Sequence, residues 1–114
     1  MAIALIPSNS DQIIKVRVKG DDGNYIDMTT VSVIAAVYQK KESVLQKWSD
    51  SDIQRVSPLG TIEFYLDRAN LKTIAGKRMF LELVVILTNS DFKNNEQRLV
   101  ATDIPLADVV LSVL

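Results

Sequence analysis

The side chains best suited to chemistry in this chain are carboxylates, and two of them form a candidate catalytic pair. Glu63 and Glu82 each lie in a segment that alternates apolar and polar residues, so they could sit on neighbouring strands as the acid and base of a glycoside hydrolase. Such a pair needs one carboxyl group with a raised pKa, and nothing in the sequence around either glutamate supplies it. Because carboxylates on strands usually face water, we expect no catalytic residue and no enzyme.

Oxygen-rich turns are the second candidate, because carboxylate and amide oxygens are ligands for Ca²⁺. Asp21, Asp22 and Asn24 gather in one turn, and Asp50 and Asp52 lie in another. Neither turn has the ligand spacing of an EF-hand loop, whereas both have the composition of an ordinary solvated turn. We therefore expect no metal site and no cofactor.

Aromatic and basic residues offer two further possibilities. Trp48 and Tyr38, with Tyr65, could form a platform for sugar rings, although a sandwich fold commonly buries one large aromatic side chain in its core. A basic stripe of Lys15, Arg17 and Lys19 could meet phosphates, with Tyr25 stacking on a base. The acidic turn that follows dilutes this charge, which favours a solvated strand face and no nucleic-acid partner.

Composition narrows the function classes further. The 114 residues contain no histidine and no cysteine, which excludes thiol nucleophiles, imidazole bases, disulfides and the common zinc ligands. A net charge of −1 creates no general attraction for nucleic acid or anionic lipid. The apolar runs are far shorter than the roughly 20 residues of a membrane span, and no targeting segment stands out. We expect a single domain over residues 1–114 with no membrane partner.

The segments that must position these residues mainly alternate apolar and polar side chains, with a period of two residues. Apolar and polar residues alternate in Ile14 to Val18 and again in Thr61 to Leu66, which is typical of strands with one face on a core. An extended segment is expected at residues 25–28, and further strands at residues 31–38, 44–48, 53–57, 77–88 and 97–102. One short helix is expected at residues 68–75, between an Asp67 cap and Gly76. Residues 20–24 and 89–95 have the composition of hairpin loops.

Seven or eight short strands separated by turns predict an all-β fold. We expect an antiparallel immunoglobulin-like β-sandwich with one short helix, with a small closed barrel as the alternative.

The order of strands and turns resembles the immunoglobulin-like module at the N-terminus of upper baseplate proteins of tailed bacteriophages. The similarity covers roughly Gln12 to Thr102. The chain departs from that family at Thr30, where glycine is common, and in its end at Leu114 with no shaft or receptor-binding part. The segments that carry the resemblance are residues 25–33, Gly60 with the strand to residue 66, the helix at 67–75, Gly76-Lys77 and the long strand at 79–85.

The resemblance implies a non-enzymatic structural protein of the virion, made in the host cytoplasm. A head decoration protein or a tail, baseplate or fibre adaptor would fit, with other virion proteins or further copies of itself as partners. The alternative is a glycan-binding module that uses Trp48 and Tyr38.

The apolar chain ends are the strongest candidate contacts. Residues 2–6 and 109–114 are apolar where polar residues would be the default, either because they are edge strands or because another subunit completes them by strand addition. We expect the loops at 21–24 and 89–95 to contribute to the same surface. The predicted contact residues are Ile3, Leu5, Val110, Leu111 and Val113.

Overall fold

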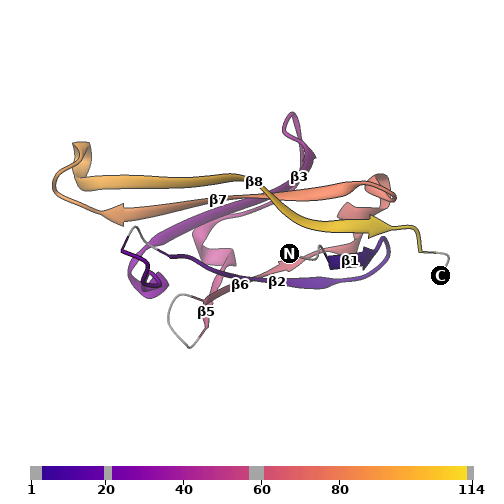
Figure 1. Cartoon of the computed structure of the whole chain (residues 1–114), viewed down its shortest axis with the longest axis horizontal. Helices are drawn as coiled ribbons and strands as arrows, with labels where there is room; N and C mark the ends of the chain where they lie inside the picture. The colour runs from indigo at the N-terminus through magenta and orange to yellow at the C-terminus, as the bar shows by residue number, and fades with distance from the viewer. Residues whose placement is uncertain (1–3, 20–21, 57–60, 113–114) are drawn as a thin grey trace.

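The chain folds into two sheets packed face to face, which confirms the predicted all-β sandwich (Figure 1). This computed structural model describes residues 4–19, 22–56 and 61–112. Within those residues there are eight strands: β1 (Ala4–Pro7), β2 (Gln12–Arg17), β3 (Ser32–Lys40), β4 (Ser43–Trp48), β5 (Gln54–Val56), β6 (Thr61–Leu66), β7 (Arg78–Thr88) and β8 (Glu96–Val110).

The strand order is that of an immunoglobulin-like domain. One sheet runs β1-β8-β7-β3-β4 and the other runs β2-β6-β5. If the eight strands are lettered A, B, C, C′, D, E, F and G, these sheets are AGFCC′ and BED, the variable-type arrangement with the first strand moved onto the last. All pairs are antiparallel except β1 with β8, which is parallel. Two separate sheets, not a closed barrel, therefore surround the core.

β7 is the central strand of the larger sheet, as its nearly continuous apolar sequence predicts. Met79, Leu81, Leu83 and Val85 point inward and are buried, while the alternate side chains on the outer face are half-buried. Across the core, the smaller sheet contributes the buried residues Ile14, Ile62, Phe64 and Leu66. The period of two therefore predicted correctly which side chains meet between the sheets.

The predicted helix is present, but it is a 3-10 helix at Arg68–Ile74. The Asp67 carboxylate accepts the backbone N–H of Ala69 at 2.9 Å, and Gly76 adopts a positive φ of 84°. Leu71 and Ile74 are the buried side chains of this helix. Because a 3-10 helix repeats every three residues, both side chains lie on the same side of the helix and face the core.

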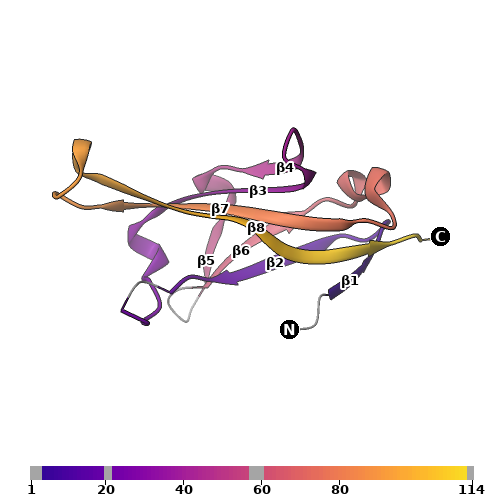
Figure 2. The same ribbon diagram turned by 45° about the horizontal axis from the view of Figure 1, so that its top comes forward.

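β8 is longer than the sequence predicts and has a sharp kink. The strand expected to end at Thr102 continues to Val110. Its register with β7 shifts opposite Leu81 and Leu83, and Asp103 takes a positive φ of 57°. A bulge of this kind bends a strand and increases its twist, and the bend is visible where β8 crosses β7 in Figure 2.

The β7–β8 hairpin extends past the other strands at one end of the molecule (Figure 1 and Figure 2). The last pair between β3 and β7 is Ser32 with Ile86, so residues 87–97, here called the arm, form a two-stranded ribbon. Its loop closes through the Asn89 N–H, which donates to the Asn95 carbonyl at 2.8 Å. Asn94 and Asn95 have positive φ, a conformation that asparagine tolerates better than most residues.

A half-buried arginine holds the chain where β3 turns away from the arm. Arg55 is 19% exposed, and its guanidinium donates to the carbonyls of Met28, Val31, Asp50 and Ile53 at 2.9–3.1 Å. It also pairs with the Asp50 carboxylate. These contacts, here called the Arg55 corner, tie two loop segments to β5 and close that end of the sandwich.

Candidate protein-contact surface

The longest sheet edge without a partner strand in the described part of the chain belongs to β8. β7 covers one side of β8, whereas β1 covers the other side only from Ala107 to Val110. Residues 96–102, here called the free edge, therefore present backbone N–H and C=O groups to solvent. By contrast, β5 has three residues and β1 has four, ending at Pro7, and short strands with proline are typical of protected edges.

β4 also lies at an edge of the larger sheet, and two of its side chains reach across to the smaller sheet. The Gln46 amide and the Trp48 indole both donate to the Tyr65 carbonyl, at 2.9 and 2.8 Å. These contacts tie β4 to the opposite sheet. Nothing similar crosses the free edge of β8 among the described residues.

A line of apolar side chains on the outer face leads directly to the free edge. Ile34 on β3 is the register partner of Val84 on β7, and Val84 is the partner of Val100 on β8. Val100 is 59% exposed and Ile34 is 40% exposed. Three strands thus align an apolar row that ends at an unpaired backbone, which combines two features of a surface for strand addition.

The kink fixes one end of the free edge. The buried Tyr38 hydroxyl donates to the Asp103 carboxylate at 2.6 Å and accepts the Asp103 N–H at 2.8 Å. The Thr102 hydroxyl lies 3.3 Å from the Tyr38 hydroxyl oxygen. Lys41 pairs with the second carboxylate oxygen of Asp103 at 3.0 Å. The Tyr38 hydroxyl, followed by Lys41, lowers the pKa of Asp103. The Asp103 carboxylate, paired with the Lys41 ammonium, is therefore held on the outer face beside Thr102.

The predicted contact residues at the chain ends gather at a second location. Leu5 is 69% exposed on β1, and Val110 and Leu111 are 40% and 74% exposed at the end of β8. The parallel register pairs Leu5 with Asp108 and Pro7 with Val110, which places Leu5 and Val110 on the same face. Their neighbours Ile6 and Val109 face the core. We call Leu5, Val110 and Leu111 the terminal corner. Ile3 and Val113 lie outside the described residues.

The two glutamates do not form a pair. Glu63 lies on β6 in the smaller sheet and Glu82 lies on β7 in the larger sheet, so they are not on neighbouring strands as the sequence suggested. Each alternates with inward-facing core residues, which places the two carboxylates on opposite outer faces of the sandwich.

The acidic turns are occupied by their own hydrogen bonds. Asp22 accepts the backbone N–H of Asn24 at 3.0 Å, and Asp52 accepts the N–H of Ser49 at 3.1 Å. Asp50 accepts the Val33 N–H at 2.7 Å in addition to its contact with the Arg55 corner. In the described ranges, no three carboxylates come together as a possible metal site. Asp21 lies outside those ranges.

The aromatic pair proposed for sugar binding is buried. Trp48 and Tyr38 are each 4% exposed, and Trp48 packs on Phe64 with ring centroids 4.7 Å apart. Neither ring offers a face to solvent, because one lies in the core between the sheets and the other supports the kink. The platform expected from the sequence therefore does not form.

Contacts within the protein also engage the basic stripe. Arg17 lies over the Tyr25 ring at 3.6 Å from its centroid, Lys19 lies at 5.1 Å from the same ring, and Lys15 approaches Glu63 at 3.9 Å. The Tyr25 face expected to stack on a base is therefore covered by the protein's own cations.

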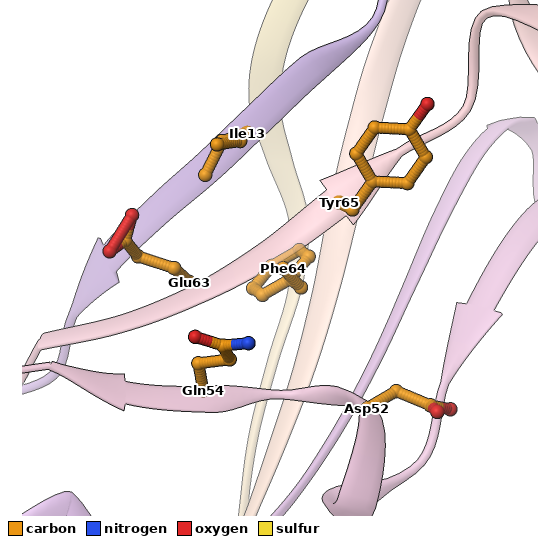
Figure 3. A pocket seen from close by; sticks show the side chains of 6 residues that line it. All are labelled: Ile13, Asp52, Gln54, Glu63, Phe64 and Tyr65. Carbon is orange, nitrogen blue, oxygen red and sulfur yellow. The ribbon is translucent and has the colours of Figure 1, made fainter.

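A small pocket lies on the outer side of the smaller sheet (Figure 3). Its volume is about 190 Å³, below the roughly 300–1,000 Å³ of typical ligand sites. In Figure 3 the carboxylates of Glu63 and Asp52 lie at opposite ends of the pocket and do not converge. The lining residues are Ile13, Asp52, Gln54, Glu63, Phe64 and Tyr65.

Sequence reasoning missed the free edge and its apolar row. The alternation in β8 is weak because Leu99, Val100 and Ala101 are all apolar, and the row becomes visible only once the register of three strands is known. Among the described residues, no helix has the length and apolar character needed to cross a membrane. Comparisons of the chain with protein-family models, curated proteins and solved structures found no match.

Proposed function

We propose that this chain is a non-enzymatic structural protein that binds protein neighbours by strand addition at the free edge of β8. The observation that supports this function is the unpaired backbone of residues 96–102 at the end of the Ile34–Val84–Val100 row. A partner strand placed there gains main-chain hydrogen bonds, and its alternate side chains cover Val100. The pocket on the outer side of the smaller sheet is smaller than typical ligand sites, and its two carboxylates do not converge (Figure 3).

The proposed setting is the particle of a tailed bacteriophage, as a head decoration protein or a tail, baseplate or fibre adaptor. This part of the proposal depends on the resemblance to the immunoglobulin-like module of upper baseplate proteins. The strand order found here is compatible with that module, although many sandwich domains share it.

The terminal corner is proposed as a second contact. Leu5, Val110 and Leu111 expose apolar side chains on a parallel strand pair, at the end of β8 beyond the kink. Substitution of the exposed Leu5 and Leu111 by lysine tests this part. The double variant should remain folded by circular dichroism and should lose incorporation into the particle. A folded double variant that incorporates normally would contradict the role of the terminal corner.

The decisive experiment compares two lysine substitutions in the assembling system. Val100→Lys places a charge on the free edge, whereas Ile13→Lys places the same charge at a residue of similar exposure, 61%, on the other sheet. Mass spectrometry of purified particles should detect the unmodified chain and Ile13→Lys but not Val100→Lys. Equal incorporation of both variants would contradict binding at the free edge, and absence of the unmodified chain from particles would contradict the phage setting.

A further inference from the structure

We propose that the partner at the free edge is a second copy of this chain, paired antiparallel about a two-fold axis at Val100. The inference depends on the proposed function and names its partner. Such pairing would join the two five-stranded sheets into one continuous sheet. β1 does not obstruct it, because β1 begins to cover β8 only at Ala107.

The sequence of the free edge is complementary to itself in this register. With Val100 on the axis, Val100 faces its own copy, Leu99 faces Ala101 of the second copy, and Arg98 faces Thr102 of the second copy. Apolar residues thus meet at the centre, and polar residues lie at both ends. The row from Ile34 through Val84 to Val100 then continues without interruption into the same row of the second copy.

Side-chain pairing favours this register over those centred on Leu99 and Arg98. Thr102 and the Asp103 carboxylate both lie beside the Tyr38 hydroxyl, so Arg98 would lie opposite Thr102 and near the Asp103–Lys41 ion pair of the second copy. An axis at Leu99 would instead place Val100 opposite Arg98, and an axis at Arg98 would place two arginines directly opposite each other. Like charges in direct opposition destabilise strand pairs.

A register centred on Gln97 would pair Glu96 with Arg98, but few residues would be available to pair. The residues before Glu96 are Asn94 and Asn95, which have φ of 59° and 57°. Left-handed residues cannot continue a strand ladder, so only a few residues would pair. The axis at Val100 pairs residues 99–101 in full and places Arg98 opposite Thr102, where the kink begins.

Single-cysteine variants test the pairing and its register together, because the chain has no cysteine of its own. Val100→Cys should form a disulfide-linked dimer quickly under mild oxidation, since opposed Cβ atoms lie about 4.5–5.5 Å apart. Gln97→Cys should not, because its two copies would be about 20 Å apart along the strands. Ile13→Cys is the control for random collision. Equal rates at all three positions, or faster linkage at Gln97, would overturn the register.

Analytical ultracentrifugation of the unmodified chain tests the dimer itself. The chain should pass from monomer to dimer between low micromolar and millimolar concentration. Arg98→Glu should weaken association at least tenfold, because it places a carboxylate beside Asp103 of the second copy. Lys47→Glu, which makes the same charge change on the exposed face of β4, should leave association unchanged. A strictly monomeric chain, or equal effects of both variants, would overturn the proposal.

The outcomes separate this inference from the proposed function. If the purified chain stays monomeric while Val100→Lys is lost from particles, the free edge binds a different protein and only the dimer is overturned. If the chain dimerises through Val100 but Val100→Lys still enters particles normally, the dimer stands and the assembly role at this edge fails.

Discussion

The Arg55 corner and the free edge of β8 lie near the same end of the sandwich, but they differ in whether their backbone groups have hydrogen-bond partners within the protein. At the corner, one guanidinium donates to carbonyls from two segments of chain. Along residues 96–102, one side of the strand has no partner in the described structure. Because unpaired polar groups are costly only when they are buried, the free edge is stable while it faces water.

Stability and contact thus depend on different side chains of this small domain. Side chains between the sheets are buried and Arg55 at the corner is largely so, and substitutions of them should lower the free energy of unfolding. Exposed side chains on the arm and the free edge should leave folding unchanged when they are substituted and should act on association. Each of the following predictions pairs a substitution with a matched control elsewhere in the domain.

The largest expected effect is at Trp48. Trp48→Ala should lower the free energy of unfolding by about 4 kcal/mol, because it leaves a cavity against Phe64 and removes the indole donor to the Tyr65 carbonyl. Phe92→Ala, at a 46% exposed ring in the arm loop, should change it by less than about 0.5 kcal/mol. Urea unfolding monitored by circular dichroism measures both. Similar losses would show that the arm loop is part of the cooperative core.

The next effect is at the Arg55 corner. Arg55→Met keeps the length of the side chain but removes the donor to four carbonyls and one of the donors to the Asp50 carboxylate, and should cost about 2–3 kcal/mol. Arg98→Met on the free edge should cost less than about 0.5 kcal/mol. The same urea experiment compares them. A loss at Arg98 equal to that at Arg55 would remove the distinction between the two regions.

Tyr38 joins the two regions and should give an intermediate effect. Tyr38→Phe removes the hydroxyl that bonds to both the carboxylate and the N–H of Asp103, and should cost about 1–2 kcal/mol. Hydrogen exchange at the Asp103 amide should accelerate, since its acceptor is gone. The control Tyr25→Phe, at a 44% exposed ring, should change neither quantity. Unchanged exchange at Asp103 would mean that the kink does not need Tyr38.

The sequence predicted the strands of the core well because their signal is local. In β6, Ile62, Phe64 and Leu66 alternate with polar residues, and this pattern alone determines which face is buried. The kink at Asp103 could not be predicted in the same way, since its support comes from Tyr38, 65 positions away. The role of Arg55 is similarly hidden, because it binds backbone carbonyls, which every residue carries.

The candidate surface was predictable only in part. Apolar chain ends led to Leu5, Val110 and Leu111, and the structure shows these side chains to be exposed. Val100 was missed because its neighbours are also apolar, so no alternation identifies its face. The sequence leaves open whether Trp48 is buried, because a tryptophan near the end of a strand can lie in the core or form an exposed binding platform. Its burial depends on Phe64 in the opposite sheet.

The smallest expected effect is a loss of stability in acid, and it should follow the Arg55 corner. The Arg55 guanidinium, followed by the Val33 N–H, lowers the pKa of Asp50 in the folded protein below its value in the unfolded chain. The folded state then binds fewer protons than the unfolded state between these two values. The contribution of Asp50 is therefore complete above about pH 4, the unfolded value, and is lost as the pH falls through the lower folded value. Urea midpoints measured between pH 6 and pH 2.5 should decline over that window.

Removal of either partner of the Asp50–Arg55 contact should reduce the contribution of Asp50 to the loss of stability in acid. Asp50→Asn has no carboxylate to protonate, and in Arg55→Met the largest cause of the lowered pKa is gone, so both variants should lose stability less steeply between about pH 4 and pH 2.5 than the unmodified chain. Both should also be less stable than the unmodified chain at pH 6, because the ion pair is broken there. Val100→Lys, on the free edge, should keep the full acid slope. If Asp50→Asn kept the slope of the unmodified chain, the acid response would arise elsewhere, and the Arg55 corner would owe its stability to the carbonyl contacts alone.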